Sequence, residues 1–274
     1  MDNLFKNNIF DEIQPPHNFK ANLLNTALPK NQDIYFVSKW NELFKRYQAA
    51  RIFIRKTQEN NWDYWFNPIP DPKVQKGVEL TFKSNLYETA LINYNILVDL
   101  SWTLTYVSAE FVLYEFDKQG KLLIAKEIRG MHSIEEAYKL LRKTENSVSS
   151  PNANGNPFMY LKTMLPKFSP AVDLIIDFWK DFSDCDIRNL YNYIKHKGKP
   201  IYKEIEALRG GKIIGININD TAYPSDIRDV QKVIELEKAI TDLVKFDDDI
   251  LFPYIKKLIN ELKCAVDPSP FAYA

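Results

Sequence analysis

Apolar residues recur at helical spacing along most of the chain. After Ser38, which is suited to cap a helix, Trp40, Leu43 and Tyr47 begin an apolar stripe, because positions three or four residues apart share one face of a helix. The stretch from about residue 78 to beyond residue 109 is apolar at most positions, which predicts a helix buried on most sides. Further helices are predicted at residues 133–146, 169–182, 183–197, 225–246 and 250–264.

Two segments have the alternating pattern of β-strands instead. In residues 111–128, the turn sequence DKQG separates two apolar runs and predicts a hairpin. In KIIGININ, residues 212–219, Ile214, Ile216 and Ile218 alternate with glycine and asparagine, and RGG supplies a turn before them. We therefore predict a mainly α-helical protein, a helical bundle with one or two small β-hairpin insertions.

Length and composition indicate one folded unit. The chain has 274 residues, of which 45% are hydrophobic and 14% aromatic, enough to bury a sizeable core. We expect one compact domain overall. Within it, residues 1–77 form an N-terminal segment with one helix packed on the core, and residues 78–274 form the bundle.

Charge and cysteine content limit the classes of function. The 36 basic and 36 acidic residues balance, so any binding of nucleic acid must come from a local patch. Two cysteines cannot make a disulfide framework or a four-cysteine zinc site. The N-terminal residues lack the continuous apolar core of a signal peptide. We therefore expect a cytoplasmic protein, and we expect no cofactor and no metal.

Residues 89–111 imitate a membrane span, but Asp99 lies at their centre. A charge there costs roughly 2.5–3.5 kcal/mol on insertion, and Asn93 and Asn95 add to that cost. A helix buried within the protein explains the segment better, so no membrane contact is expected. Because a buried acid needs a partner, we expect an Arg, Lys or Tyr from a neighbouring helix beside Asp99.

Two other clusters have both a structural and a functional interpretation. The acidic run at residues 247–249 could ligate a metal with Glu261 or Asp242, but three acids at the start of a helix ordinarily stabilise its positive end. The aromatic residues of NNWDYWF, residues 60–66, could stack on bases. In a Pro-rich loop such residues more often hold the loop against the core. We prefer the structural interpretation of both.

The predicted helix at residues 183–197 gathers polar and cationic residues on one face. Ile187, Leu190 and Ile194 fall on the side that packs against a bundle. Arg188 could hold phosphate oxygens by two-pronged hydrogen bonds, and His196, which titrates near neutrality, could move protons. The structural alternative is that this face is simply solvated and that the cations in its last turn complement the helix dipole. The face that we expect to be exposed, with the lysines that follow it, comprises Arg188, Asn189, Asn192, Lys195, His196, Lys197 and Lys199.

The stretch RNLYNYIKH, residues 188–196, resembles the signature of the HEPN superfamily (higher eukaryotes and prokaryotes nucleotide-binding). That signature is an Arg, usually followed by a polar residue such as Asn, then four to six residues, then a His. The resemblance makes Arg188 the motif Arg, Asn189 its polar follower and His196 the motif His. Seven residues separate Arg188 from His196 here, which leaves the two about 80° apart around an ideal helix.

Members of that superfamily are helical bundles that commonly dimerise. Many are metal-independent endoribonucleases of toxin–antitoxin, abortive-infection or CRISPR-linked phage-defence systems, and others have lost catalysis. The resemblance therefore implies either an RNA-cleaving homodimer, in which Arg188 and His196 of two subunits share a cleft and a protein antitoxin is a partner, or an inactive module that binds nucleotide, RNA or protein. A third reading is that the motif is a coincidence in an unrelated helical protein.

Overall fold

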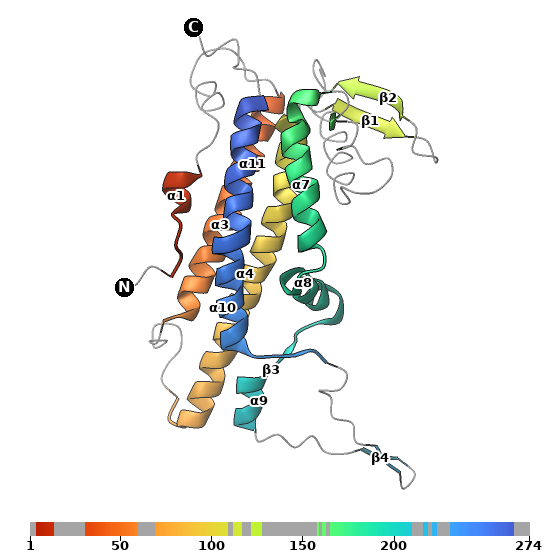
Figure 1. Cartoon of the computed structure of the whole chain (residues 1–274). Coiled ribbons are helices and arrows are strands. Elements are labelled where there is room, and N and C mark those ends of the chain that lie inside the picture. Colours follow the sequence, from red (N-terminus) through yellow and green to blue (C-terminus); the bar gives the residue numbers. More distant parts are fainter. Residues whose placement is uncertain are drawn as a thin grey trace.

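The central element of the fold is a long helix, α4 (Pro72–Ser108), which contacts α3, α7, α8, α9, α10 and α11. The computed structural model of the chain (Figure 1) describes residues 4–13, 31–59, 69–108, 112–116, 122–127, 158, 161–162, 165–209, 216–218, 221–223 and 231–265. Most residues of α4 from Tyr87 onward are buried. The prediction of a helix buried on most sides is confirmed, because its apolar residues surround the whole helix and neighbours must cover every side.

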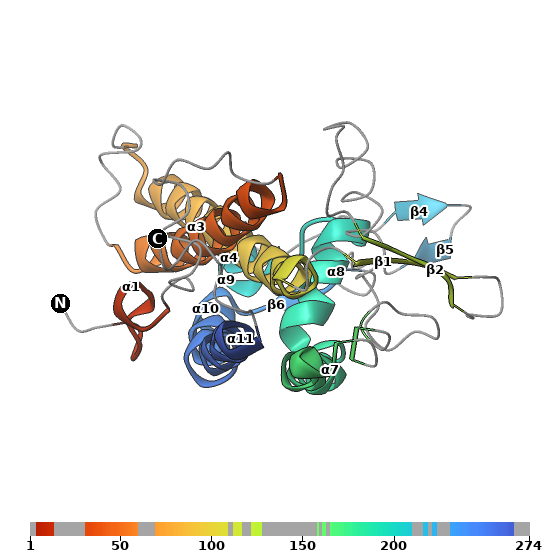
Figure 2. The same ribbon diagram turned by 90° about the horizontal axis from the view of Figure 1, so that it is seen from above.

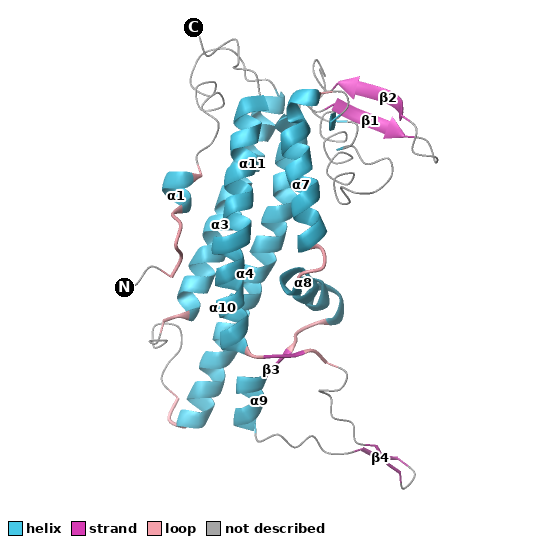
Figure 3. Cartoon of the chain, in the orientation of Figure 1, coloured by secondary structure: helices cyan, strands magenta, loops and turns pink. Residues whose placement is uncertain are grey.

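The long helices lie side by side as a bundle, and the described structure is mainly helical (Figure 3). Seen from above (Figure 2), α3 and α4 form one row, and α7 and the C-terminal helix form a second. The helix α8 lies across the bundle rather than along it (Figure 1). Besides α4, the helices are α1 (Ile9–Glu12), α3 (Asn31–Thr57), η1 (Pro166–Phe168), α7 (Ser169–Phe182), α8 (Asp186–Lys197), α9 (Lys203–Arg209), α10 (Leu236–Phe246), η3 (Asp247–Leu251) and α11 (Phe252–Ala265).

In the described part of the chain, three two-stranded sheets accompany the bundle. Strands β1 (Val112–Phe116) and β2 (Leu122–Glu127) are antiparallel, so the first predicted hairpin is confirmed. Strands β4 (Ile216–Ile218) and β5 (Thr221–Tyr223) are antiparallel and form the second hairpin, so β4 pairs with residues that follow it and not with residues before RGG. A short parallel pair joins β3 (Ile201–Tyr202) to β6 (Val233–Ile234). The expected class, a helical bundle with small β insertions, is correct.

Three helix starts differ from the sequence-based expectation. The helix predicted from residue 225 begins only at Leu236, and Val233 and Ile234 before it form a strand. The helix α3 begins at Asn31, so Ser38 lies inside it instead of capping it. No glycine or proline lies between the two positions, and nothing in the backbone therefore forces a start at Ser38. The helix α4 begins at Pro72, where Asp71 accepts hydrogen bonds from the backbone N–H groups of Lys73 (2.8 Å) and Val74 (3.3 Å). Pro at the first helical position behind a capping Asp is a start signal.

The C-terminal helix contains a wide turn in its middle. The α10, η3 and α11 segments follow one another without a break, and the acidic run lies in η3, a π-helical turn. The expectation that these acids begin a helix is therefore wrong. Pro253 supplies a physical reason, because it has no N–H to donate and its ring needs room beside the preceding turn. The N–H of Phe252 reaches back to the carbonyl of Asp247, which is the longer spacing of a π-helix.

One hydrophobic core joins the described elements. It contains residues from α1, α3, α4, α7, α8, α10 and α11, including residues on both sides of the expected division at 77/78. An aromatic pair links the two rows of helices: the rings of Trp102 on α4 and Trp179 on α7 lie edge to face at 4.7 Å. Within the second row, the rings of Phe178 on α7 and Tyr254 on α11 are stacked 3.8 Å apart.

None of the described helices is both long and apolar enough to span a membrane. In α4 the polar residues Asn93, Asn95, Ser101 and Thr105 are buried and bonded to backbone carbonyls one turn earlier or, for Ser101, three residues earlier. The predicted helix at 133–146 and the aromatic residues of 60–66 lie outside the described residues.

Candidate functional site

The helix α8 is delimited at both ends by local chemistry. The Sγ of Cys185 accepts the N–H of Arg188 at 3.5 Å, and Asp186 places a negative charge in the positive first turn. At the other end Gly198 has φ +98°, a left-handed conformation that favours glycine. Ile187 and Leu190 are buried against the bundle, which confirms the predicted packing face.

The sequence predicted Arg188 on the exposed face of α8, but the structure does not place it there. Its side chain is 16% exposed and turns toward α4. The guanidinium carbon lies 5.3 Å from the ring centre of Trp179, 5.7 Å from that of Phe182 and 5.2 Å from that of Tyr191. Because α8 crosses the bundle, a position that looks peripheral on a helical wheel meets α7 and α4. Cations over aromatic faces are attracted by the ring quadrupole, so these rings hold the group in place.

Asn95 of α4 orients this guanidinium. Its Oδ1 accepts a hydrogen bond from Arg188 Nη1 at 3.2 Å, and its Nδ2 donates to the carbonyl of Leu91 at 2.9 Å. Asn95 is fully buried. Because the amide nitrogen is committed to the backbone, the amide oxygen has one orientation, and that orientation faces Arg188. In the sequence, Asn95 stands out only as a polar residue unsuited to a membrane span.

Asp99 lies one turn after Asn95 and also faces Arg188. Its Oδ1 is 3.9 Å from Arg188 Nη1, an ion pair without a direct hydrogen bond. The expectation of a cationic partner from a neighbouring helix is confirmed, but the side chain is 48% exposed rather than buried. Partial burial raises the pKa of Asp99, and the nearby Arg188 and Lys195 oppose that rise.

Arg188 has hydrogen-bonding capacity to spare. A guanidinium has five N–H donors, and Arg188 makes a single side-chain hydrogen bond within the described part of the chain. In that same part, Trp102 Nε1 is the sole buried side-chain nitrogen or oxygen without a partner. The other Arg188 donors have no hydrogen-bond partner among the described residues. We call Arg188, Asn95 and Asp99 the Arg188 cluster.

The remaining predicted residues lie along α8 and just after it. Lys195, His196 and Lys197 are exposed and form what we call the basic end of α8. Asn192 is half-buried, and the exposed Asn189 donates to the carbonyl of Asp184 at 3.0 Å.

Lys199 is bound to α4 rather than free. Its Nζ lies 2.5 Å from Asn85 Oδ1 and 3.2 Å from Glu88 Oε1. Tyr202 adds a hydrogen bond to Glu88 at 2.6 Å, so the segment after α8 is held against α4. These contacts fix where the basic end of α8 lies relative to the Arg188 cluster.

The helix is regular between the two motif residues. Since α8 is α-helical throughout Asp186–Lys197, Arg188 and His196 remain about 80° apart around the axis and about 12 Å apart along it. The structure therefore brings Arg188 together with Asn95 and Asp99, and leaves His196 with the two neighbouring lysines.

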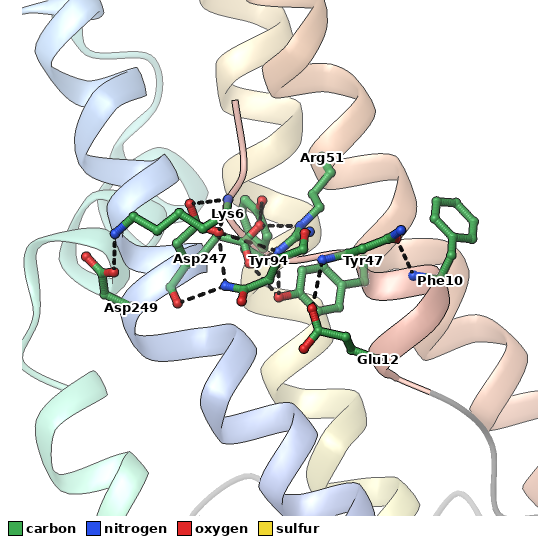
Figure 4. Close-up of polar contacts among 11 residues, drawn as sticks. Lys6, Phe10, Glu12, Tyr47, Arg51, Tyr94, Asp247 and Asp249 are labelled. Carbon is green, nitrogen blue, oxygen red and sulfur yellow. Dashed lines mark hydrogen bonds and ion pairs between the residues drawn. The ribbon is translucent and has the colours of Figure 1, made fainter. Parts of the chain in front are cut away.

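A second arginine cluster lies at the centre of the bundle (Figure 4) and was missed by sequence reasoning. Arg51 donates to Asp247 through Nε (2.7 Å) and Nη2 (3.0 Å), to the carbonyl of Asn7 through Nη1 (2.6 Å), and to the hydroxyl of Tyr47 (3.5 Å). Asp247 is fully buried and also accepts the hydroxyls of Tyr47 and Tyr94, the latter at 2.6 Å. The signal was present: Arg51 follows Tyr47 by four residues and so lies on the apolar face of α3.

The other two acids of the run hold the N-terminal segment. Both carboxylate oxygens of Asp248 accept the backbone N–H of Lys6 at 3.1 Å, and Asp249 pairs with the Lys6 ammonium at 2.9 Å. The acidic run thus has structural partners, as preferred from the sequence, though not at a helix start. Within the described ranges, no group of three or more His, Cys, Asp or Glu side chains is placed to hold a metal ion.

Comparison of the chain with protein-family models, with curated proteins and with solved structures gave no match.

Proposed function

We propose that this protein is a HEPN-like, RNA-binding endoribonuclease that acts without a metal and as a homodimer. The observation that carries the proposal is the state of Arg188: Asn95 and three aromatic rings hold its guanidinium in place, and all but one of its donors lack a partner among the described residues. A pre-oriented guanidinium with vacant donors matches the oxygens of a phosphodiester. The basic end of α8 adds exposed positive charge to the same helix.

The proposed reaction is transesterification within RNA. The ribose 2′-oxygen forms a bond to the adjacent phosphorus, and the bond from phosphorus to the next 5′-oxygen breaks. A base takes the proton of the 2′-hydroxyl and an acid gives a proton to the leaving 5′-oxygen, so the products carry a 2′,3′-cyclic phosphate and a 5′-hydroxyl. His196 is the candidate for proton transfer, and Arg188 is the candidate to stabilise charge on the phosphate oxygens.

The geometry of α8 is the reason for proposing a dimer. A single subunit presents one His196, about 12 Å along the helix from Arg188, whereas the reaction needs two proton transfers. A two-fold partner supplies a second His196 and a second Arg188 to one shared site. The proposal therefore requires a symmetric dimer in which the ends of the two α8 helices face each other.

The test is cleavage of mixed-sequence RNA by purified protein in EDTA. We expect wild-type protein to produce 2′,3′-cyclic phosphate ends, and His196→Ala to lose this activity by about 10²-fold or more. Lys257→Ala removes an exposed charge on α11 and serves as the control that should cleave normally. Light scattering on the same samples tests the dimer. Cleavage that survives His196→Ala, or a monomer that cleaves, contradicts the proposal.

A second candidate is an inactive HEPN-like module that binds nucleotide, RNA or a protein such as an antitoxin. The regularity of α8 favours it, because nothing in the helix compensates for the long spacing between Arg188 and His196. This candidate predicts RNA binding that depends on Arg188, without cleavage under any of the conditions above.

A further inference from the structure

The two arginine clusters provide an internal comparison. Arg51 makes four side-chain hydrogen bonds, two of them to the carboxylate of Asp247. The guanidinium of Arg51 lies near the rings of Phe5, Tyr47 and Phe252, and that of Arg188 has a similar aromatic surround. The carboxylate neighbour of Arg188, Asp99, however, lies 3.9 Å away and makes no hydrogen bond to it. At Arg51 the guanidinium is hydrogen-bonded to its carboxylate partner, Asp247. In the Arg188 cluster the carboxylate of Asp99 forms an ion pair with the guanidinium but no hydrogen bond.

In the Arg188 cluster, one set of residues holds the guanidinium in position, and a different residue, Asp99, supplies the negative charge beside it. The buried Asn95 has a fixed amide and supplies a direct hydrogen bond, and the rings of Trp179, Phe182 and Tyr191 confine the guanidinium. Asp99 is not needed to hold Arg188 in place. It does place a negative charge where an anion bound to Arg188 would lie.

We propose that Asp99 is an exchangeable counter-ion of Arg188, which a phosphate of the bound RNA displaces. Before RNA binds, the carboxylate balances part of the positive charge of Arg188 and of the nearby Lys195. When a phosphate takes the vacant donors of Arg188, it approaches the Asp99 carboxylate and is repelled. Asp99 therefore weakens the binding of every phosphate, and a ligand must form further contacts, for instance with Lys195 and Lys197, to bind well.

This inference rests on the proposed function, and it predicts a gain of affinity from removal of a charge. Asp99→Asn keeps the shape of the side chain and removes its charge. We expect it to bind a short fluorescein-labelled single-stranded RNA about threefold to tenfold more tightly than wild type, as measured by fluorescence anisotropy in EDTA with His196→Ala as the common background. The gain should shrink at high salt, because screening weakens the repulsion.

Two further variants make the test specific. Asp242→Asn changes the net charge equally at an exposed position on α10, and should leave affinity unchanged at the same salt concentration. Arg188→Ala should weaken binding by about tenfold or more. A merely structural role for Asp99 would change the melting temperature or weaken RNA binding, and it would not tighten binding.

The outcomes separate the two proposals. If Arg188→Ala weakens binding but Asp99→Asn leaves it unchanged or weakens it, RNA binding at Arg188 stands and the counter-ion proposal is overturned. If neither wild type nor Asp99→Asn binds the RNA, the proposed function fails and the counter-ion proposal fails with it. Tighter binding by both Asp99→Asn and Asp242→Asn would mean a general effect of charge, and would also overturn the counter-ion proposal.

Discussion

Arg51 and Asp247 lie 196 positions apart in the sequence, yet their side chains form two hydrogen bonds in the core, at 2.7 Å and 3.0 Å. The pair joins α3 to the π-helical turn of the C-terminal helix, and the hydroxyl of Tyr94 connects α4 to the same carboxylate. Burial raises the pKa of Tyr94, and the adjacent Asp247 raises it further, so this hydroxyl stays protonated and donates. An ion pair in the interior is tolerated because these contacts satisfy its groups.

Asp247→Ala should lower the free energy of unfolding by about 3–5 kcal/mol, because Arg51 would remain as a buried charge without its carboxylate. Urea unfolding followed by circular dichroism measures this loss. Asp249→Ala removes an exposed acid from the same turn, and should change stability little. Equal losses from the two variants would show that the buried pair has no special importance.

Asp248→Ala should release the N-terminal segment at residues 4–13 while the bundle remains folded. The carboxylate of Asp248 accepts the backbone N–H of Lys6 and the side-chain amide of Asn7. Because the variant loses this charge-assisted hydrogen bond, the Lys6 amide hydrogen should exchange with solvent about tenfold to a hundredfold faster. Hydrogen exchange resolved by residue measures it. Asp249→Ala, which keeps the backbone contact, should leave that amide protected.

Asp99 should titrate above the ordinary aspartate pKa of about 3.9, because partial burial raises its pKa more than Arg188 and Lys195 lower it. Arg188→Ala should therefore raise the pKa of Asp99 further. Carbon-detected NMR of the carboxylate in the two proteins measures both values. An unchanged or lower pKa in the variant would contradict the pairing.

The same shift has a defined effect on stability. A carboxyl with a raised pKa in the folded state binds more protons there than in the unfolded state. Its contribution to stability therefore falls as pH rises from about 4 through the folded-state pKa, and is constant above it. Asp99→Asn should remove this part of the pH dependence.

Two glycines should respond to alanine in opposite directions. Gly198 has φ +98° and open space around the missing Cβ, so Gly198→Ala should cost about 1–2 kcal/mol from the backbone conformation alone. Gly77 lies inside α4, and a Cβ there would meet Leu208 at an ordinary 4.0 Å. Gly77→Ala should therefore stabilise the protein by about 0.5–1 kcal/mol. Thermal or urea unfolding of the two variants in parallel tests the pair.

Local sequence patterns predicted the helices and hairpins. They failed at boundaries that depend on more than the neighbouring residues. The turn DKQG correctly predicted the β1–β2 hairpin, because turn chemistry acts over a few residues. The capping preference of Ser38 was overridden, since the residues before it also continue a helix. The wide turn at Asp247–Leu251 was missed because a buried partner, Arg51, draws its first acid into the core.

The sequence predicted only part of the arrangement around α8. Periodicity correctly put Ile187 and Leu190 against the core, and an acid in an apolar helix correctly indicated a cationic partner for Asp99. Periodicity also put Arg188 on the exposed side, and this was wrong. A helical wheel describes one helix by itself, and whether a given face is covered depends on which helix crosses it.

The sequence by itself determined the mainly helical class, the hairpins, and the position of a polar, cationic helix, because propensity, periodicity and turn chemistry act between near neighbours. The tertiary structure alone decided that Arg188 joins Asn95 and Asp99, and that Arg51 joins Asp247. Each of these contacts joins residues on different helices, far apart in the sequence, and depends on the angle at which those helices cross. No pattern within a single helix contains that angle.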